Sequence, residues 1–322
     1  MFATIGGEHD LGIRTIKNYW IALVVVWAVG VGTASAAEVD VTAPAPEIGH
    51  GLVQGYMHGQ QPLNSVKFVP APPQADSPRQ AADNAISQST MTLRGSPRWD
   101  LAAKDAVLTF PEAAGIFQCA LGMDISESKT PALYRLMQRS LTDFGLATYP
   151  AKKAYQRARP FLSNKEAICT PDDLEALKKD GSYPSGHSAV GWGWALTLSQ
   201  LAPERAERVL APGRSYAQSR IICNVHWMSD TEAGMAVGAA AFARLQNDAL
   251  FQATMTVARQ EITQNLGGDA EPKAFTNAAK VIEVSGWSMP TTEEKNISST
   301  LRRVHSITNG FSKTCPPSSI SI

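Results

Sequence analysis

The amino-acid sequence predicts an all-α fold whose helices lie between about residues 95 and 265. Apolar residues recur there with the helical period of about 3.6 residues, most clearly from Leu133 to Phe144, where they form one face. In contrast, no segment shows the alternation of apolar and polar residues that predicts a strand. Hydrophobic residues make up 44% of the chain, which is enough for a core and argues against a disordered protein.

Helix-start signals and apolar periodicity together place six helical segments in this region. Thr130-Pro131 begins the first, because threonine caps a helix and proline fits its first turn. Pro150 and Pro160 bound the second, since proline can begin a helix but cannot continue one. The expected helices cover residues 131–144, 150–159, 185–200, 204–221, 227–247 and 249–264.

The N-terminus has the pattern of a cleaved secretory signal. An apolar run at residues 21–31 follows Arg14 and Lys17 and precedes Ala34-Ser35-Ala36. The alternative is a membrane anchor, but a span needs about 20 apolar residues. The run has 11, so we expect cleavage after Ala36 and no stable membrane anchor in the mature chain.

Two further segments flank the helical domain and carry little periodicity. Eight prolines between residues 38 and 97 predict extended or loop chain, although residues 81–91 are compatible with a short helix. The last segment is rich in serine and threonine, and no structure is predicted for it. The expected organisation is a signal peptide at 1–36, a Pro-rich segment at 37–94, the all-α domain at 95–265 and a C-terminal tail at 266–322.

The charge balance bears on the class of partner. The chain has 29 Lys+Arg and 29 Asp+Glu, so its formal net charge is zero. A nucleic-acid-binding protein normally carries a basic excess, and we therefore expect no nucleic-acid partner.

The segment Lys152-x6-Arg159-Pro160 is the first of three candidate binding segments. Seven residues at about 100° each turn a helix by about 700°, so Lys152 and Arg159 should share one face of the predicted helix. Two cations on one face suit an anion, and the arginine fork suits phosphate oxygens. Alone, such a pair is more typical of a solvated helix surface.

The second segment, Gly181-Ser182-Tyr183-Pro184-Ser185-Gly186-His187-Ser188, runs into a predicted helix. A helix N-terminus presents free backbone N–H groups to an anion. Gly186 would let the backbone approach a ligand closely, and the Ser185 hydroxyl could donate to the same oxygens. His187 could pass a proton to a leaving group. The alternative is an ordinary capped helix with an exposed histidine.

The third segment is Ser219-Arg220-x5-His226-x3-Asp230. His226 and Asp230 are four residues apart, so on a helix their side chains would meet. A carboxylate that accepts from one imidazole nitrogen leaves the other as a directed nucleophile or base. A surface pair and a metal site are the alternatives, but a metal site would need further ligands at recognisable spacing.

The three segments in this order resemble the signature of the phosphatidic-acid-phosphatase type 2 and vanadium-haloperoxidase superfamily. All eight of its phosphate-site positions are present here. The contexts at 181–187, 218–220 and 223–230 resemble the class A bacterial non-specific acid phosphatases, and the resemblance spans about residues 68–262. Met228 departs from the glutamine usual in that family, and we expect only an altered neighbour contact from it.

This resemblance implies the helical bundle fold of that superfamily and a metal-independent acid phosphatase with broad phosphomonoester substrates. His226 would attack phosphorus to form a phosphohistidine, Asp230 would hold its tautomer, and His187 would protonate the leaving alcohol and later activate water. The phosphoryl oxygens would be held by Lys152, Arg159, Ser185, Gly186 and Arg220. No metal or other cofactor is expected, because three cationic side chains can supply the positive charge.

The same resemblance, together with export, implies a periplasmic protein, a homodimer and a Cys169–Cys223 disulfide, since an exported protein can keep such a bond. Two free buried thiols are the alternative. A second bridge between Cys119 and Cys315 has weaker support, because Cys315 lies in the tail. The rival functions are a vanadate-dependent haloperoxidase, a membrane lipid phosphatase and a non-catalytic anion-binding protein.

Overall fold

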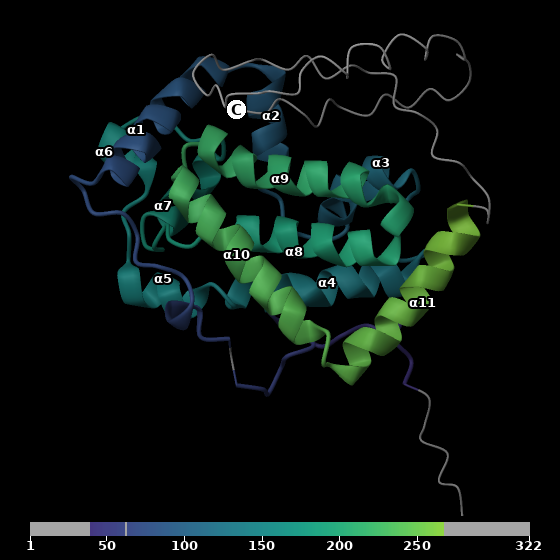
Figure 1. Cartoon of the computed structure of the whole chain (residues 1–322). Coiled ribbons are helices and arrows are strands. Elements are labelled where there is room, and N and C mark those ends of the chain that lie inside the picture. Colours follow the sequence, from purple (N-terminus) through teal and green to yellow (C-terminus); the bar gives the residue numbers. More distant parts are fainter. Residues whose placement is uncertain (1–38, 62, 267–322) are drawn as a thin grey trace, which may run out of the picture. The chain divides into compact units, whose positions relative to one another are not determined.

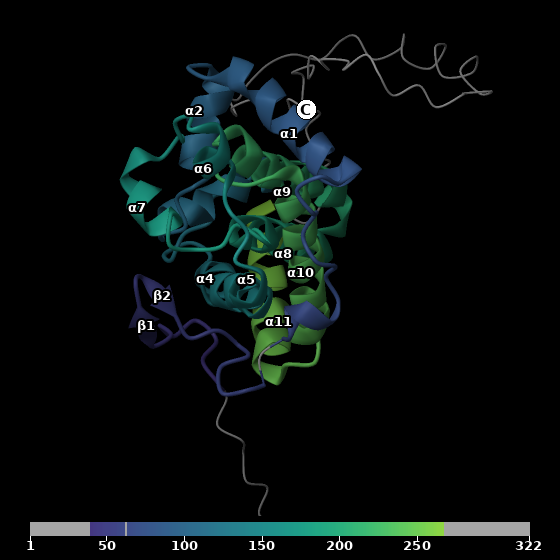
Figure 2. The ribbon, with the colours of Figure 1, turned by 90° about the vertical axis from the view of Figure 1, so that its left-hand side faces the viewer.

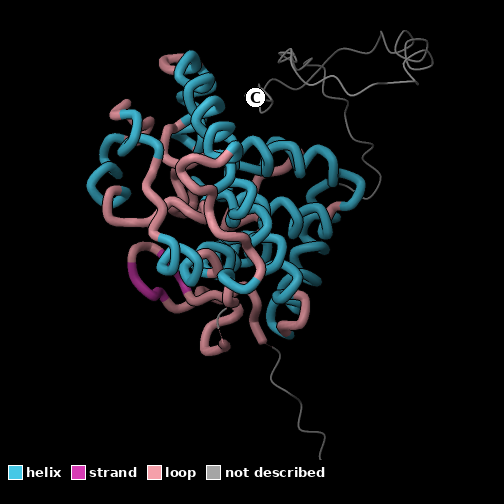
Figure 3. Tube along the Cα trace, turned by 60° about the vertical axis from the view of Figure 1, so that its left-hand side comes forward, coloured by secondary structure: helices cyan, strands magenta, loops and turns pink. Residues whose placement is uncertain are grey.

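The computed structural model describes residues 39–61 and 63–266 of the chain. The predicted signal peptide and all but the first residue of the predicted tail lie outside these residues. Within them the architecture is all-α, as predicted, with loops between the helices and one small strand pair (Figure 3). No helix in this part of the chain combines the length and hydropathy that a bilayer span requires.

Five long helices build the core and position the candidate site. Helix α8 packs against α4, α9 and α10, and α11 packs against α4 (Figure 1). The sequence predictions for these helices are confirmed to within a few residues at their ends. The bounds are Pro131–Leu146 for α4, Gly186–Leu201 for α8, Ala206–Ile222 for α9, Met228–Leu245 for α10 and Ala249–Leu266 for α11.

The apolar face predicted for α4 is buried as expected. Leu133, Leu136, Met137 and Phe144 are fully buried in the main hydrophobic cluster, which also takes in residues of α8, α10 and α11. The N-terminus of α4 is capped from α11, because Glu261 accepts hydrogen bonds from the backbone N–H groups of Ala132 and Leu133, both at 2.9 Å.

Helix α10 crosses α8 at two glycines. A Cβ atom at Gly234 would collide with the carbonyl oxygen of Ser185, and one at Gly238 would collide with that of Ala189. The backbones can therefore approach only because both positions lack a side chain. The contact brings the first turn of α10 against the first turn of α8, which is where two of the three motif segments lie.

Shorter helices surround the core, most of them at its motif-bearing end; the exception is Gln118–Leu121, which lies near the start of α9 at the opposite end (Figures 1 and 2). Their bounds are Pro78–Thr90 for α1, Pro97–Lys104 for α2, Gln118–Leu121 for α3, Tyr149–Tyr155 for α5, Pro160–Asn164 for α6 and Leu174–Leu177 for α7. Short 3-10 turns lie at Ser65–Lys67, Met91–Leu93, Glu112–Phe117, Pro171–Asp173 and Pro203–Arg205. Helix α1 contains the short helix that residues 81–91 suggested, and it begins where the Ser77 hydroxyl caps Gln80.

Two sequence predictions are wrong in detail. Strands β1 (Glu47–Gly49) and β2 (Leu52–Val53) pair antiparallel in the Pro-rich segment, and they are too short to show an alternating pattern. The helix expected at 150–159 ends at Tyr155, because Gln156 adopts a left-handed conformation with φ of 44°. Arg159 therefore lies in an extended segment before α6, and it shares no helix face with Lys152.

Candidate active site

The ends of five helices bring the three motif segments together. Lys152 lies in α5, and Arg159 immediately precedes α6. Ser185, Gly186 and His187 lie at the start of α8, Arg220 in the last turn of α9, and Asp230 in the first turn of α10. His226 lies in the short connection between α9 and α10. The eight predicted residues thus lie in short helices, at helix ends or in the connections beside them.

The His226 imidazole is held between a carboxylate and a guanidinium. Its Nδ1 lies 3.3 Å from Oδ2 of Asp230, and its Nε2 lies 3.1 Å from Nη1 of Arg159. A carboxylate accepts and a guanidinium donates, so Nδ1 carries the proton and Nε2 presents its lone pair toward the cation. The sequence prediction placed His226 and Asp230 on one helix, but α10 begins after His226, and the two side chains meet across its N-terminus. Oδ2 of Asp230 also accepts a hydrogen bond from the N–H of Trp227 at 2.8 Å.

The surroundings keep this imidazole neutral. Burial lowers the pKa of His226 well below its ordinary value, and the charges of Arg159, Lys152 and Arg220 lower it further. The side chain of His226 is only 3% exposed. A buried, uncharged imidazole with one nitrogen tied to a carboxylate is the state of histidine that can act as a nucleophile.

Three buried cationic side chains surround the histidine. Lys152, Arg159 and Arg220 are all buried, with whole-residue exposures of 4%, 2% and 1%. Burial and the charge of Arg159 lower the pKa of Lys152 to about 8, and burial lowers that of Arg220 to about 10. Nε and Nη1 of Arg220 have no hydrogen-bond acceptor among the described residues. Because buried N–H groups are nearly always paired, these donors suit an anionic ligand.

The start of α8 adds neutral donors. The Ser185 Oγ accepts from the N–H of Ser188 at 3.2 Å and from its hydroxyl at 2.9 Å, which leaves its own proton free to donate. Gly186 has an ordinary φ, and the nearest protein atom to a Cβ there would be Thr148 Oγ1 at 3.7 Å. Neither the backbone nor the packing of the protein requires glycine at this position, whereas close approach of a ligand would.

His187 is fixed by a backbone carbonyl. Its Nε2 donates to the oxygen of Ala106 at 3.0 Å, and its ring stacks on Tyr216 with 6.3 Å between centroids. This hydrogen bond leaves Nδ1 as the nitrogen that can exchange a proton with a ligand. Burial lowers the pKa of His187 well below its ordinary value, with a further contribution from the charge of Arg220.

Two charged residues at the site were missed by sequence reasoning. The first is Arg157, whose Nη1 donates to Oδ1 of Asp230 at 2.6 Å and to Ser229 Oγ at 2.7 Å. Its Nη2 donates to two residues of α1, Gln80 at 2.6 Å and Asp83 at 2.8 Å. Arg157 lies inside the Lys-x6-Arg segment, but no spacing rule distinguishes it from a surface arginine.

The second missed residue is Asp180, immediately before the Gly181–His187 segment. Its Oδ2 is 3.0 Å from both Lys152 Nζ and Arg159 Nη2. This carboxylate, rather than a common helix face, is what relates the two cations of the first motif. A carboxylate next to a glycine-rich segment is common in loops, so the sequence contained no signal for this role.

A disulfide joins the two cysteines expected to pair, Cys169 and Cys223, with 4.7 Å between their Cα atoms. It is supported by a backbone hydrogen bond from Cys169 N to Cys223 O at 3.3 Å. The bond ties the loop after α6 to the connection that carries His226. The weakly supported second bridge from Cys119 to Cys315 is not tested, because Cys315 lies outside the described residues.

Comparison with known proteins relates this chain to one superfamily and to several acid phosphatases. Residues 139–250 match the PAP2 superfamily. The chain is 40% identical over 211 residues to a non-specific acid phosphatase of Salmonella typhimurium, covering 65% of this chain and 84% of that protein. It is 40% identical over 195 residues to an acid phosphatase of Zymomonas mobilis, covering 61% and 74%. It is 38% identical over 210 residues to a non-specific acid phosphatase of Providencia stuartii, covering 65% and 85%.

Among solved structures, the chain has 18% identity and a TM-score of 0.35 to a transmembrane PAP2-type phosphatidylglycerolphosphate phosphatase from Bacillus subtilis. The match covers 53% of this chain and 87% of that one.

Proposed function

Because this chain belongs to the non-specific acid phosphatases of the PAP2 superfamily, we propose that it hydrolyses phosphomonoesters to an alcohol and inorganic phosphate. The observation that carries this proposal is the His226 imidazole, neutral and oriented by Asp230, with its Nε2 facing a group of buried cations. An anionic phosphoryl group bound to those cations would lie in front of a nucleophilic nitrogen.

The first chemical step forms a phosphohistidine. The Nε2 lone pair of His226 forms a bond to phosphorus while the bond from phosphorus to the ester oxygen breaks. Asp230 stabilises the positive charge that develops on the ring, through its bond to Nδ1. His187 gives a proton to the departing oxygen, so the leaving group departs as a neutral alcohol.

The second step releases phosphate. A water oxygen attacks phosphorus, the bond between phosphorus and Nε2 breaks, and His187 takes a proton from the water. In both steps charge spreads over the phosphoryl oxygens, and fixed donors around those oxygens lower the barrier. Lys152, Arg159, Arg220, the Ser185 hydroxyl and the Gly186 N–H are the proposed donors. Since three of these groups are cations, the proposed mechanism uses no divalent metal.

We also propose the remaining features that the sequence predicts. Residues 1–36 are a signal peptide, the enzyme acts in the periplasm, the catalytic domain spans 95–265, and two chains associate as a dimer. N-terminal sequencing of the periplasmic protein should give Ala37 as its first residue, and gel filtration with light scattering should give twice the mass of the mature chain. An uncleaved, membrane-bound product would contradict the first two features.

The test of the function is hydrolysis of p-nitrophenyl phosphate by the purified protein, with and without EDTA. We expect turnover that EDTA leaves unchanged, and we expect His226→Ala to lose nearly all of it, since the nucleophile is gone. Mixing the enzyme with an ester radiolabelled at phosphorus and quenching in alkaline denaturant, in which phosphohistidine is stable, should trap label on histidine in the wild type and not in this variant. Near-normal turnover by His226→Ala would refute the assignment of the nucleophile. Bromide oxidation after addition of vanadate, without phosphatase activity before it, would favour a haloperoxidase instead.

A further inference from the structure

Asp180 occupies an unusual position among the residues of the candidate site. Its carboxylate oxygen Oδ2 contacts two cations that we propose bind the substrate phosphoryl group, Lys152 and Arg159, each at 3.0 Å. The two cationic side chains are 5% and 2% exposed, whereas that of Asp180 is 39% exposed. Asp180 therefore reaches from the surface of the protein onto buried donors.

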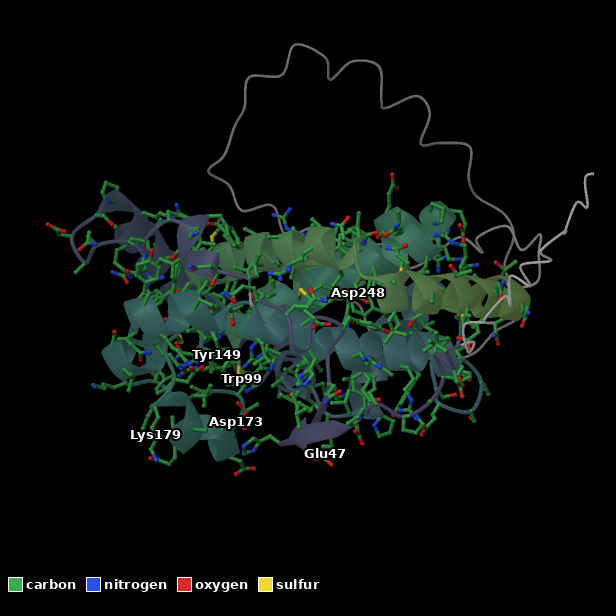
Figure 4. All side chains as sticks on the ribbon, turned by 90° about the horizontal axis from the view of Figure 1, so that it is seen from below. Glu47, Trp99, Tyr149, Asp173, Lys179 and Asp248 are labelled. Carbon is green, nitrogen blue, oxygen red and sulfur yellow. A yellow bond between two sulfur atoms is a disulfide. The ribbon has the colours of Figure 1, made fainter. Side chains whose placement is uncertain are left out.

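The segment that carries Asp180 is accessible to solvent. Asp173 and Lys179 in the same stretch are exposed, and in Figure 4 they lie at the outer edge of the ribbon. The carboxylate itself has no hydrogen bond from its own segment among those found for the described residues; its partners are the two cations. Water can solvate this carboxylate once it leaves the ion pairs, but the two buried cations then need another anion in its place, so release of Asp180 is coupled to binding of an anionic ligand.

Other partners of the two cations come from the backbone or from His226. Lys152 donates to the carbonyl of Gly181, and Arg159 donates to the carbonyl of Val225 at 2.9 Å and to His226. These groups are neutral and part of the rigid framework. Asp180 is thus the charged acceptor that Lys152 and Arg159 share. Because Nε of Arg159 also donates to the main-chain carbonyl of Asp180 at 3.0 Å, any displacement is confined to the side chain of Asp180. A carboxylate and a phosphoryl group seek the same N–H donors, and the dianion of a phosphate carries more charge.

We infer that Asp180 is an internal competitor of the phosphoryl group for Lys152 and Arg159. The carboxylate yields these donors when substrate binds, and it returns to them as inorganic phosphate departs. This inference rests on the proposed function and adds a residue that sets product release. Three buried cations would otherwise retain the phosphate product, and a returning carboxylate weakens that retention without reducing the positive charge available during the reaction.

The test is equilibrium binding of inorganic phosphate to the full mature chain, measured by titration calorimetry, together with steady-state kinetics. In Asp180→Asn the shape is kept and the competing charge is removed. We expect phosphate to bind about 3- to 30-fold more tightly, as loss of two partly exposed ion pairs would give. Product inhibition should strengthen by the same factor, and KM for p-nitrophenyl phosphate should fall.

Two further variants separate competition from other effects of the substitution. Asp172→Asn removes the same charge from an exposed position in the turn Pro171–Asp173, so phosphate affinity should stay within about twofold of the wild type. Asp180→Glu retains the charge and should retain weak phosphate binding. Thermal unfolding of each variant reports whether it is folded.

Unchanged or weaker phosphate binding by folded Asp180→Asn, in an active wild type, would overturn the inference and make Asp180 a positioning residue for the two cations. An equal gain in affinity from Asp172→Asn would overturn it as well, because the effect would then be one of overall charge. A wild type that neither binds phosphate nor hydrolyses p-nitrophenyl phosphate would instead refute the proposed function.

Discussion

The pKa values of the two histidines of the site shift in the same direction, although their proposed roles need opposite protonation states. Burial and neighbouring cations lower the pKa of both His226 and His187 well below the ordinary value. For His226 this favours the proposed role of nucleophile, because a lowered pKa keeps the imidazole unprotonated at lower pH. For the proton donor it is unfavourable at neutral pH, because only a small fraction of His187 then carries the proton that it must give. The negative charge of a bound phosphoryl group would partly restore that fraction.

The need for a neutral His226 and a protonated His187 predicts that activity rises as the pH falls, by an amount that depends on the leaving group. As pH falls, the protonated fraction of His187 rises, so kcat/KM should rise until His226 takes up a proton as well and the rate falls again. The effect should be larger for an alkyl phosphate than for p-nitrophenyl phosphate, because p-nitrophenolate departs readily without a proton. Likewise, His187→Ala should lose at least tenfold more activity on the alkyl ester. Equal losses on both esters would argue against His187 as the acid.

Arg157 donates to Oδ1 of Asp230, whereas His226 contacts the other carboxylate oxygen, Oδ2. Asp230 is fully buried, and burial raises its pKa, whereas the charge of Arg157 lowers it. Without the arginine, the carboxyl group would take up a proton at higher pH and could no longer accept the hydrogen bond from Nδ1 of His226. Arg157 is therefore a positioning residue that acts through Asp230.

We expect Arg157→Gln to lower kcat by roughly 10- to 100-fold, corresponding to about 1.4–2.8 kcal/mol, with a smaller change in KM. Because the pKa of Asp230 would rise, the acid limb of the pH profile should move to higher pH. Gln80→Ala removes another partner of Arg157 and should leave that limb in place. A uniform loss of activity at every pH, with no movement of the limb, would indicate a purely structural role.

At the scale of elements, the catalytic geometry depends on how closely α10 approaches α8. The carbonyl oxygen of Asp230 accepts from the N–H of Ser185 at 2.9 Å, which links the residue proposed to orient His226 to the start of α8. Helix α1 adds a second link, since Asp83 accepts from the N–H of Ser229 at 2.9 Å. Gly234, one turn after Asp230, is the one of the two contact glycines that lies nearer to the site.

Gly234→Ala should therefore damage both stability and activity. The new methyl group would collide with the Ser185 carbonyl and lie 3.0 Å from Ser188 Cβ, neither of which can move without shifting α8. We expect a loss of about 1–3 kcal/mol in the free energy of unfolding and at least a tenfold loss in kcat. Gly115→Ala is the matched control, since a Cβ there meets nothing within 4 Å. Urea denaturation and the p-nitrophenyl phosphate assay measure the two effects, and a fully active Gly234→Ala would contradict this account.

Across the whole molecule, residues that follow a spacing pattern could be predicted from the sequence. Residues that form ion pairs or hydrogen bonds with them could not. The long helices have apolar periodicity, and the eight motif residues have fixed separations along the chain. Arg157 and Asp180 have neither, because their partners lie on α1, α5 and α10 and meet only after folding. The helix at α5 was predicted too long because two prolines mark its outer limits, whereas the left-handed Gln156 between them has no such signature.

The Cys169–Cys223 disulfide is the covalent link between distant parts of the site, and it gives the last prediction. It closes a loop of 54 residues that contains Asp180 and the whole segment from Gly181 to Arg220. A crosslink of this length restricts the unfolded chain and contributes about 2–4 kcal/mol to stability.

We expect the double variant Cys169→Ala/Cys223→Ala to melt roughly 5–15 °C lower by differential scanning calorimetry. Because the hydrogen bonds of His226 come from Asp230 and Arg159, its kcat well below the melting temperature should stay within about threefold of the wild type. An unchanged melting temperature would contradict the stabilising role of the bond. A large loss of kcat well below the melting temperature would show that the bond also acts on the site.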